Sequence, residues 1–148
     1  MSNWQDTLHG ETATVEFGQR LADALKLRLA AQPSHTVHLH GELGAGKTTL
    51  VRGVLRAFGH SGAVKSPTYT LLEPYNCGGQ QIYHFDLYRV NDPEELAFVG
   101  FDEIIDGEGL KVIEWPERAD SWLPAPDTTV RLRVDDSTSR TATVEFSA

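Results

Sequence analysis

Apolar side chains recur every four residues in the first part of the chain. This spacing predicts an amphipathic helix over about residues 12–31. The repeating positions are Phe17, Leu21, Leu25 and Leu29. Thr12 is the expected N-cap of this helix, because its hydroxyl can accept a hydrogen bond from the free amides of the first turn. Residues 1–10 lack the repeat and are expected to form a loose lead-in.

Short β-branched or alternating runs predict strands in the rest of the chain. They are expected at residues 36–40, 69–75, 81–85, 110–114, 130–134 and 142–146. The second and third runs, and again the last two, are separated by short turn-forming segments, which predicts two antiparallel hairpins. Helical spacing returns at residues 48–58, and Asp92-Pro93 begins a further short helix.

The order of these elements predicts an α/β protein. We expect a three-layer P-loop NTPase fold with a mainly parallel central sheet and antiparallel hairpin additions. The length of 148 residues is that of one domain, so residues 1–148 are predicted to form a single P-loop ATPase domain.

Composition narrows the class of protein further. The chain has 21 acidic and 13 basic residues and a net charge of −8, which opposes tight autonomous binding to nucleic acid. No apolar run approaches the roughly 20 residues that span a bilayer, so no membrane association is expected. The single Cys77 cannot form an internal disulfide, and this predicts a reducing, cytoplasmic location.

One stretch, residues 41–48, carries the candidate chemistry. It reads Gly41-Glu42-Leu43-Gly44-Ala45-Gly46-Lys47-Thr48 and matches the phosphate-binding pattern G-x-x-x-x-G-K-[ST]. The stretch lies between a predicted strand and a predicted helix. Its glycines allow main-chain amides to surround phosphate oxygens at the N-terminus of that helix. The sequence therefore predicts a nucleoside triphosphate site.

The side chains around this stretch have predicted roles. Lys47 supplies a positive charge to the β- and γ-phosphates, and the Thr48 hydroxyl can join the coordination shell of Mg²⁺. The expected nucleotide contacts are Gly41, Glu42, Leu43, Gly44, Ala45, Gly46, Lys47, Thr48 and Thr49. Thr14 is a further candidate for the wall beside the base. The guanine-reading pattern Asn-Lys-x-Asp is absent from the sequence, which favours ATP.

Two predicted strands end in a carboxylate, Asp86 and Glu114. In P-loop enzymes one such acid holds Mg²⁺ and another can orient the attacking water, and the residues alone leave open which acid does which. Thr68, in a polar cluster after the helix at 48–58, is a candidate sensor of the γ-phosphate or Mg²⁺. Lys47, Thr68, Asp86 and Glu114 are therefore the catalytic candidates, and Trp115 is a candidate contact beside them.

Four stretches together resemble one known family. They are Gly41–Leu50, Ser66-Pro67-Thr68-Tyr69-Thr70-Leu71, His84-Phe85-Asp86-Leu87-Tyr88-Arg89 and Ile113-Glu114-Trp115-Pro116-Glu117-Arg118. In this order and spacing they resemble the TsaE family, the small bacterial P-loop ATPases of tRNA threonylcarbamoyladenosine biosynthesis. The resemblance runs from about residue 11 to residue 123, and the predicted C-terminal hairpin carries no family motif.

The resemblance implies a partner and a role for each site residue. Members bind ATP and Mg²⁺, hydrolyse ATP slowly and act with a TsaB–TsaD complex, which modifies the adenosine beside the tRNA anticodon. tRNA is then met only indirectly, through that complex. By the same resemblance Lys47 holds phosphates, Thr48 and Glu114 ligate Mg²⁺, Asp86 is the Walker B-like acid, Thr68 is switch-like, and Trp115 lies beside the site.

Two other functions are compatible with a nucleotide site. A small-molecule kinase would bring an arginine-rich lid, and the chain shows no such segment. A nucleotide-gated binding module would need no turnover, and the presence of both Asp86 and Glu114 argues mildly against it. Because no arginine finger is evident in the chain, with Arg89 and Arg118 as the nearest candidates, turnover by the isolated protein is expected to be slow.

Overall fold

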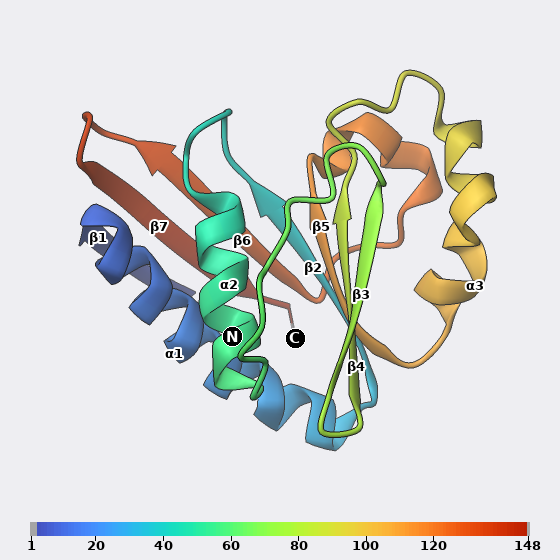
Figure 1. Ribbon diagram of the computed structural model, residues 1–148, viewed down its shortest axis with the longest axis horizontal. Helices are drawn as coiled ribbons and strands as arrows, with labels where there is room; N and C mark the ends of the chain where they lie inside the picture. Colours follow the sequence, from blue (N-terminus) through green and yellow to red (C-terminus); the bar gives the residue numbers. More distant parts are fainter. Residues whose placement is uncertain (1–2, 148) are drawn as a thin grey trace.

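Residues 3–147, the part of the chain that the computed structural model describes, form one seven-stranded sheet with helices on both of its faces (Figure 1). The strands are β1 (Asn3–His9), β2 (Ser34–His40), β3 (Leu72–Cys77), β4 (Gln80–Asp86), β5 (Gly109–Glu114), β6 (Thr128–Val134) and β7 (Ser139–Phe146). The helices are α1 (Gly10–Ala31), α2 (Lys47–Ala57) and α3 (Phe101–Asp106), with the 3₁₀ helices η1 (Pro93–Val99) and η2 (Pro116–Trp122).

The strand order explains where a site can form. It is β1-β7-β6-β2-β5-β4-β3. The central strands β6, β2, β5 and β4 run parallel, and antiparallel strands extend the sheet on both sides. The predicted α/β class, with a parallel centre and hairpin additions, is confirmed. The C-terminal ends of β2, β4 and β5 meet at one edge, which is where ligands bind in parallel α/β sheets.

Two apolar clusters cover the two faces of the sheet. Leu25 of α1 and Val51 of α2 pack on one face together with Val112 of β5. The next residue of β5, Ile113, points to the opposite face, because side chains alternate along a strand. There it joins Phe101 of α3 in a second cluster. The sheet therefore lies between two helical layers, as predicted.

Helices α1 and α2 approach each other at two glycines. A Cβ atom on Gly18 would lie 2.3 Å from the carbonyl oxygen of Leu50, and one on Gly53 would lie 2.2 Å from that of Val15. Both neighbours are backbone atoms, which cannot give way as a flexible side chain would. The glycines therefore permit this close packing, and the packing fixes the place where α2 begins.

The N-terminal segment differs from the prediction. A loose lead-in is wrong for residues 3–9, which form β1 and pair with β7 from Asn3 opposite Glu145 to His9 opposite Ser139. Within β1 only Leu8 is buried, so this edge strand lacks the alternating apolar pattern by which a sequence reveals a strand. Its main-chain pairing holds it in place. Residues 1–2 of the predicted lead-in lie outside the described residues.

Two predicted element starts also move. Thr12 is not the N-cap of α1: the helix begins at Gly10, whose amide donates a hydrogen bond of 2.8 Å to the Thr138 carbonyl. Strand β3 begins at Leu72 rather than at residue 69, because Leu71 has a φ of 69° and its amide donates to the Pro67 carbonyl. Residues 66–71 therefore approach the sheet as a turn.

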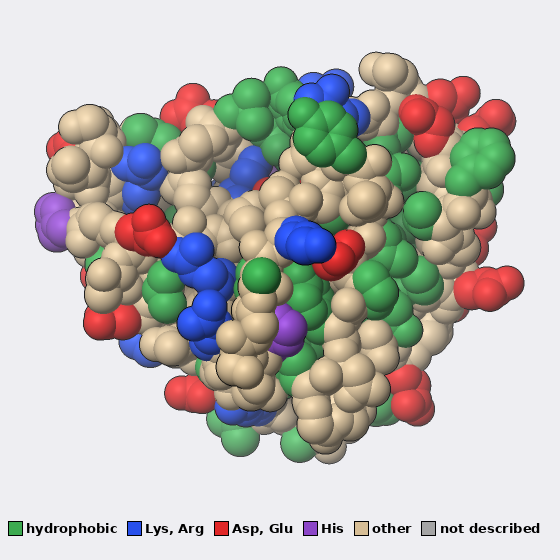
Figure 2. All heavy atoms as spheres, viewed as in Figure 1, with side chains coloured by type: hydrophobic (Ala, Val, Ile, Leu, Met, Phe, Trp, Pro, Cys, Tyr) green, Lys and Arg blue, Asp and Glu red, His purple; other side chains and the backbone are tan. Residues whose placement is uncertain are grey.

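The surface is acidic overall but not evenly so. On the face shown in Figure 2, Lys and Arg side chains gather over α2, and most of the Asp and Glu side chains lie toward the outline. This face thus offers only a local basic patch. None of the helices in residues 3–147 combines the length and the apolar character that crossing a membrane requires.

Candidate functional site

The glycine-rich loop joins the end of β2 to the start of α2. Gly44 and Gly46 have φ angles of 80° and 103°, a region that favours glycine. Gly46 is the N-cap residue of α2, so the loop amides and the positive end of the helix dipole face the same space. A Cβ on Gly41 would lie 3.1 Å from both Ala45 Cβ and the Leu132 carbonyl, so this position is also closely packed.

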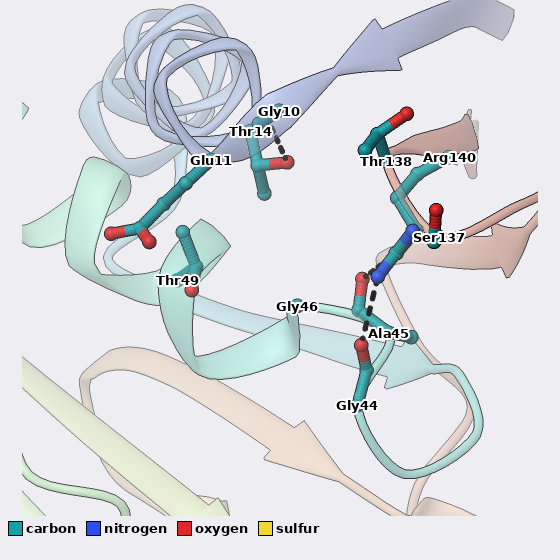
Figure 3. Close-up of a pocket in the computed structure, with 10 residues that line it drawn as sticks. All are labelled: Gly10, Glu11, Thr14, Gly44, Ala45, Gly46, Thr49, Ser137, Thr138 and Arg140. Carbon is teal, nitrogen blue, oxygen red and sulfur yellow. Dashed lines mark hydrogen bonds between the residues drawn. The ribbon is translucent and has the colours of Figure 1, made fainter.

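The loop separates two cavities. The first has a volume of about 270 Å³ and is lined by Gly10, Glu11, Thr14, Gly44, Ala45, Gly46, Thr49, Ser137, Thr138 and Arg140 (Figure 3). The second has a volume of about 320 Å³ and is lined by Leu43, Gly44, Ala45, Gly46, Lys47, Thr48, Thr49, Ser66, Thr68, Asp86, Glu114 and Trp115. The same loop residues thus face both cavities, and a ligand that lies along the loop can reach from one to the other.

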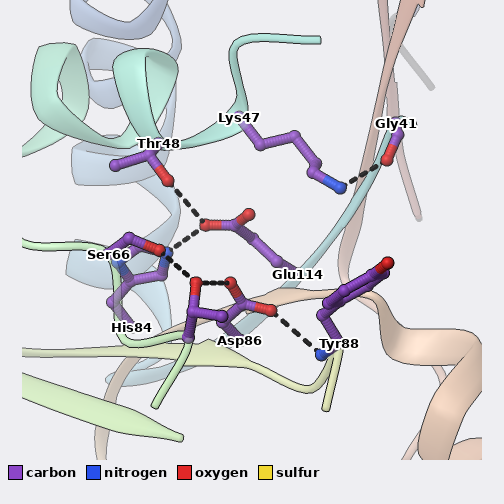
Figure 4. A network of polar contacts seen from close by, with 9 residues as sticks. Gly41, Lys47, Thr48, Ser66, His84, Asp86, Tyr88 and Glu114 are labelled. Carbon is purple, nitrogen blue, oxygen red and sulfur yellow. Dashed lines mark hydrogen bonds and ion pairs between the residues drawn. The ribbon is translucent and has the colours of Figure 1, made fainter. Parts of the chain in front are cut away.

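Asp86 and Glu114 meet in the second cavity. They are neighbours in the register of β4 and β5, and 4% and 2% of their surfaces are exposed. The Asp86 carboxylate accepts hydrogen bonds of 3.0 Å from the Thr68 hydroxyl and from the Tyr88 amide (Figure 4). Ser66 Oγ lies 2.6 Å from Thr68 Oγ1. The predicted pair of strand-end acids is therefore assembled in one place, together with the polar cluster that contains Thr68.

The Glu114 carboxylate has a second polar environment. Its Oε2 atom lies 2.5 Å from His84 Nε2 and accepts a longer hydrogen bond, of 3.5 Å, from the Thr48 hydroxyl. The sequence analysis missed His84. The signal was present, because His84 lies two residues before Asp86 and residues two apart share one face of a strand.

Lys47 crosses the second cavity between the loop and Trp115. Its ammonium group donates a hydrogen bond to the Gly41 carbonyl and lies 3.9 Å from the centre of the Trp115 ring. Burial lowers the pKa of Lys47 from its usual 10.5, and the carboxylates of Glu114 and Asp86 oppose that shift. Trp115 has a φ of 56°, a value that residues other than glycine rarely adopt. With this strained backbone its ring lies beside the lysine.

The first cavity contains the predicted Thr14 and several residues that the sequence analysis missed, and one of these, Arg140, bonds to the glycine-rich loop. The Thr14 hydroxyl bonds back to the Gly10 carbonyl at 3.4 Å. Arg140 of β7 donates to the loop carbonyls of Ala45, at 3.0 Å, and Gly44, at 3.2 Å (Figure 3). The C-terminal hairpin, which has no family motif in the sequence, is thus attached to the glycine-rich loop through this arginine.

Most predicted site residues line one of the two cavities, but two do not. Gly41 and Glu42 line neither. Gly41 instead accepts the hydrogen bond from Lys47, and the Glu42 carbonyl accepts one of 3.0 Å from the Ala45 amide within the loop. Both residues therefore shape the loop through their backbone rather than facing the space that a ligand would occupy.

The donor set suits a magnesium ion. Mg²⁺ is typically bound by one or two carboxylates together with substrate phosphates. Thr48, Asp86 and Glu114 supply one hydroxyl and two carboxylates to the same cavity, next to a loop built from positive-φ glycines. These residues fit both Mg²⁺ and a phosphate chain.

The fold and site define an α/β protein whose glycine-rich loop meets two strand-end carboxylates at the edge of a parallel sheet. The family model described as "Threonylcarbamoyl adenosine biosynthesis protein TsaE" matches residues 8–142, so the chain belongs to the TsaE family. Among curated proteins, the "tRNA threonylcarbamoyladenosine biosynthesis protein TsaE" of Haemophilus influenzae is 48% identical over 82% of this chain and 77% of its own length. The protein of that name from Rickettsia bellii is 38% identical over 95% of this chain and 93% of its own.

A solved structure has the same fold. The crystal structure of Bacillus subtilis YdiB superposes with a TM-score of 0.78 and covers 99% of this chain and 87% of its own. Its sequence is 24% identical to this chain, so the comparison supports the architecture alone.

Proposed function

We propose that this chain is a Mg²⁺-dependent ATPase with slow intrinsic turnover that supports a TsaB–TsaD complex in forming threonylcarbamoyladenosine next to the tRNA anticodon. One observation carries the proposal: Lys47, the loop amides and two strand-end acids converge on one cavity in a chain of the TsaE family. The role in this pathway is supported by the names of the relatives. The buried free thiol of Cys77 is compatible with work in the cytoplasm.

Each part of the site has a role in this proposal. The loop amides and Lys47 hold the phosphate chain in the second cavity. Thr14 and Thr49 offer hydroxyls to the nucleoside end in the first cavity, on the other side of the loop. Thr48 and Glu114, with Asp86 beside them, hold Mg²⁺, which when bound neutralises charge on the β- and γ-phosphates.

The two acids divide the work according to their neighbours. Glu114 Oε2 accepts a hydrogen bond from the hydroxyl of Thr48, which is the second residue after the glycine-rich loop ends at Gly46. We therefore assign Glu114 and Thr48 to the metal. Asp86 instead bonds to Thr68, so we assign these two to orienting the attacking water and responding to the γ-phosphate. Metal contact by Asp86 through a water is compatible with this assignment.

The two arginines nearest to the strand-end acids by sequence, Arg89 and Arg118, contact aromatic rings, which fits slow turnover. The Arg89 guanidinium stacks on the Tyr69 ring at 4.4 Å and donates to its hydroxyl at 3.2 Å. The Arg118 guanidinium lies 5.9 Å from the centre of the Trp115 ring. Neither group lines the second cavity, so the stabilising charge that an arginine finger supplies would have to come from a rearrangement or from a partner.

The test is ATP turnover by the purified chain, alone and then with TsaB–TsaD and tRNA, with Lys47→Ala as the control. We expect slow turnover that rises with the partners and disappears in the variant. If the rate of ATP turnover is the same with and without the partners, the nucleotide site is still supported but the proposed role in the pathway is contradicted. Turnover that persists in Lys47→Ala would remove the site assignment itself.

A further inference from the structure

His84 is a fully buried histidine that contacts Glu114, one of the candidate metal ligands. It lies on β4, its side chain has no exposed surface, and its Nε2 is 2.5 Å from Glu114 Oε2. Its other ring nitrogen, Nδ1, is buried and has no hydrogen-bond partner within residues 3–147. The roles assigned above to Lys47, Thr48, Asp86 and Glu114 leave this ring without a function.

The unequal surroundings of the two nitrogens show where a ring hydrogen lies. An ionised carboxylate can only accept a hydrogen bond, so the nitrogen that faces Glu114 must carry a proton. Nδ1 has no acceptor within residues 3–147 to receive a hydrogen. The geometry therefore places a ring hydrogen on Nε2, directed at Glu114 Oε2.

We propose that His84 is a positioning residue that holds the Glu114 carboxylate in the orientation needed for Mg²⁺·nucleotide. The inference rests on the proposed function, because it assumes that Glu114 serves the metal. In the structure two groups hold Glu114 Oε2, and the contact with Thr48 is the longer one, at 3.5 Å. If the Thr48 hydroxyl ligated the metal, the hydrogen bond from His84 would still hold Glu114 Oε2.

The direction of the hydrogen bond also decides which oxygen is available. His84 fixes Oε2, and Figure 4 shows the second carboxylate oxygen of Glu114 pointing away from His84, toward the side of Lys47. A carboxylate held by one oxygen cannot rotate freely, so the other oxygen is presented to the cavity in one direction. Hydrogen-bonded partners of metal ligands typically change metal affinity or activity 10–100-fold when they are replaced.

Two substitutions distinguish the effect of losing the hydrogen bond to Glu114 from the effect of losing the volume of the His84 ring. His84→Leu removes the donor and keeps an apolar side chain in the strand, and His84→Gln keeps an N–H donor at a similar reach. His60→Leu, on a histidine that lies outside both cavities, is the matched control. Thermal unfolding of every variant establishes that it is folded before the site is assayed.

Binding of ADP is then measured by calorimetry, with Mg²⁺ and with EDTA. For His84→Leu we expect unchanged affinity in EDTA, because the loop and Lys47 are intact, and a loss of roughly tenfold or more in the tightening that Mg²⁺ provides. ATP turnover should fall in kcat and show a raised KM, because KM approaches the dissociation constant of Mg²⁺·ATP when turnover is slow. His84→Gln should recover most of both losses. Equal Mg²⁺ responses in His84→Leu and the wild type would overturn the inference.

A spectroscopic measurement on the wild type makes the test independent of any variant. A long-range ¹H–¹⁵N spectrum distinguishes protonated from bare ring nitrogens, and His84→Gln identifies which ring signals belong to His84. We expect Nε2 to be protonated. A bare Nε2 would contradict the proposal. If the wild type itself binds no Mg²⁺·ADP, the proposed function fails, whereas a wild type that binds and a His84→Leu variant that matches it refute only the role of His84.

Discussion

Asp86 of β4 and Glu114 of β5 stand side by side at the same level of two parallel strands. Both carboxylates are almost completely buried, and both are held by hydrogen bonds from different neighbours. Two buried acids so close together are an arrangement that a cation stabilises, and Lys47 is the cation that the chain itself supplies. The pair therefore places two carboxylates at the end of the parallel sheet, in the cavity beside the glycine-rich loop.

The first prediction separates the two acids. Asp86→Asn and Glu114→Gln should each lower kcat for ATP roughly 100-fold or more, because a water-orienting base or a metal ligand is lost. Only Glu114→Gln should also reduce the tightening of ADP binding by Mg²⁺. Calorimetry and single-turnover assays measure the two effects, with the exposed Asp102→Asn of α3 as the control. Unchanged trace turnover in both variants would favour a binding module over an enzyme.

The second prediction concerns the packing of α1 on α2. Gly18→Ala should lower the free energy of unfolding by about 1–3 kcal/mol, since the new Cβ meets the Leu50 carbonyl at 2.3 Å. It should also weaken nucleotide binding, because a displaced α2 carries Lys47 with it. Urea denaturation and ADP titration measure both. Gly62→Ala is the matched control, since its Cβ would meet only the side chain of His60. If Gly18→Ala has the same free energy of unfolding as the wild type, α1 and α2 can move apart without loss of stability.

The third prediction concerns the bond between the C-terminal hairpin and the loop. In a trans peptide the C=O and N–H groups point in opposite directions. Arg140 attracts the Ala45 carbonyl toward the hairpin, so the Gly46 amide of the same peptide turns away from it. Arg140→Gln should therefore weaken ADP binding about tenfold, the effect of losing hydrogen bonds from a charged donor. Arg131→Gln, on an exposed residue of the same hairpin, should bind ADP normally. Equal affinities would mean that the loop is already rigid without the arginine.

These residues also show what the sequence could and could not predict. The four-residue spacing predicted α1 because the helix buries those positions, and two strand-end acids could be expected together because parallel strands end at one edge of a sheet. Strand β1 was missed because an edge strand held by main-chain bonds needs few apolar side chains. Arg140 was missed because its contact joins residues 96 positions apart, and no local pattern records such a distance.

The fourth prediction is a dependence of stability on pH. His35 is buried and lies 2.8 Å from the Thr128 hydroxyl, and burial lowers its pKa from 6.5 despite the nearby Asp127. Below pH 6.5 the unfolded chain binds a proton at His35 that the folded chain does not, so the stability from this residue is present above that pH and is lost as the pH falls. His35→Gln should therefore cost stability at about pH 8 and progressively less toward about pH 5. Urea midpoints across this range measure the difference. A constant difference would show that His35 titrates normally in the folded protein.

The last prediction uses the contact between Lys47 and Trp115. The ammonium group lies over the indole ring, and the same group is needed by the phosphates of a bound nucleotide. A cation over an aromatic ring contributes about 0.5–2 kcal/mol, so phosphate must compete with the ring for the lysine. Nucleotide binding should then change the fluorescence of Trp115, which loses its cation.

The strained backbone of Trp115 indicates that its contact with Lys47 also affects nucleotide affinity, and not only fluorescence. A φ of 56° costs of order 1–3 kcal/mol for a residue with a side chain, so the ring is kept beside Lys47 at a cost to stability. Trp115→Phe should remove the fluorescence change and still hold the lysine, whereas Trp115→Ala should release it and alter ADP affinity. Trp4 and Trp122 line neither cavity and provide the constant background. A change of the same size in Trp115→Phe would show that the signal comes from another tryptophan and would contradict the prediction.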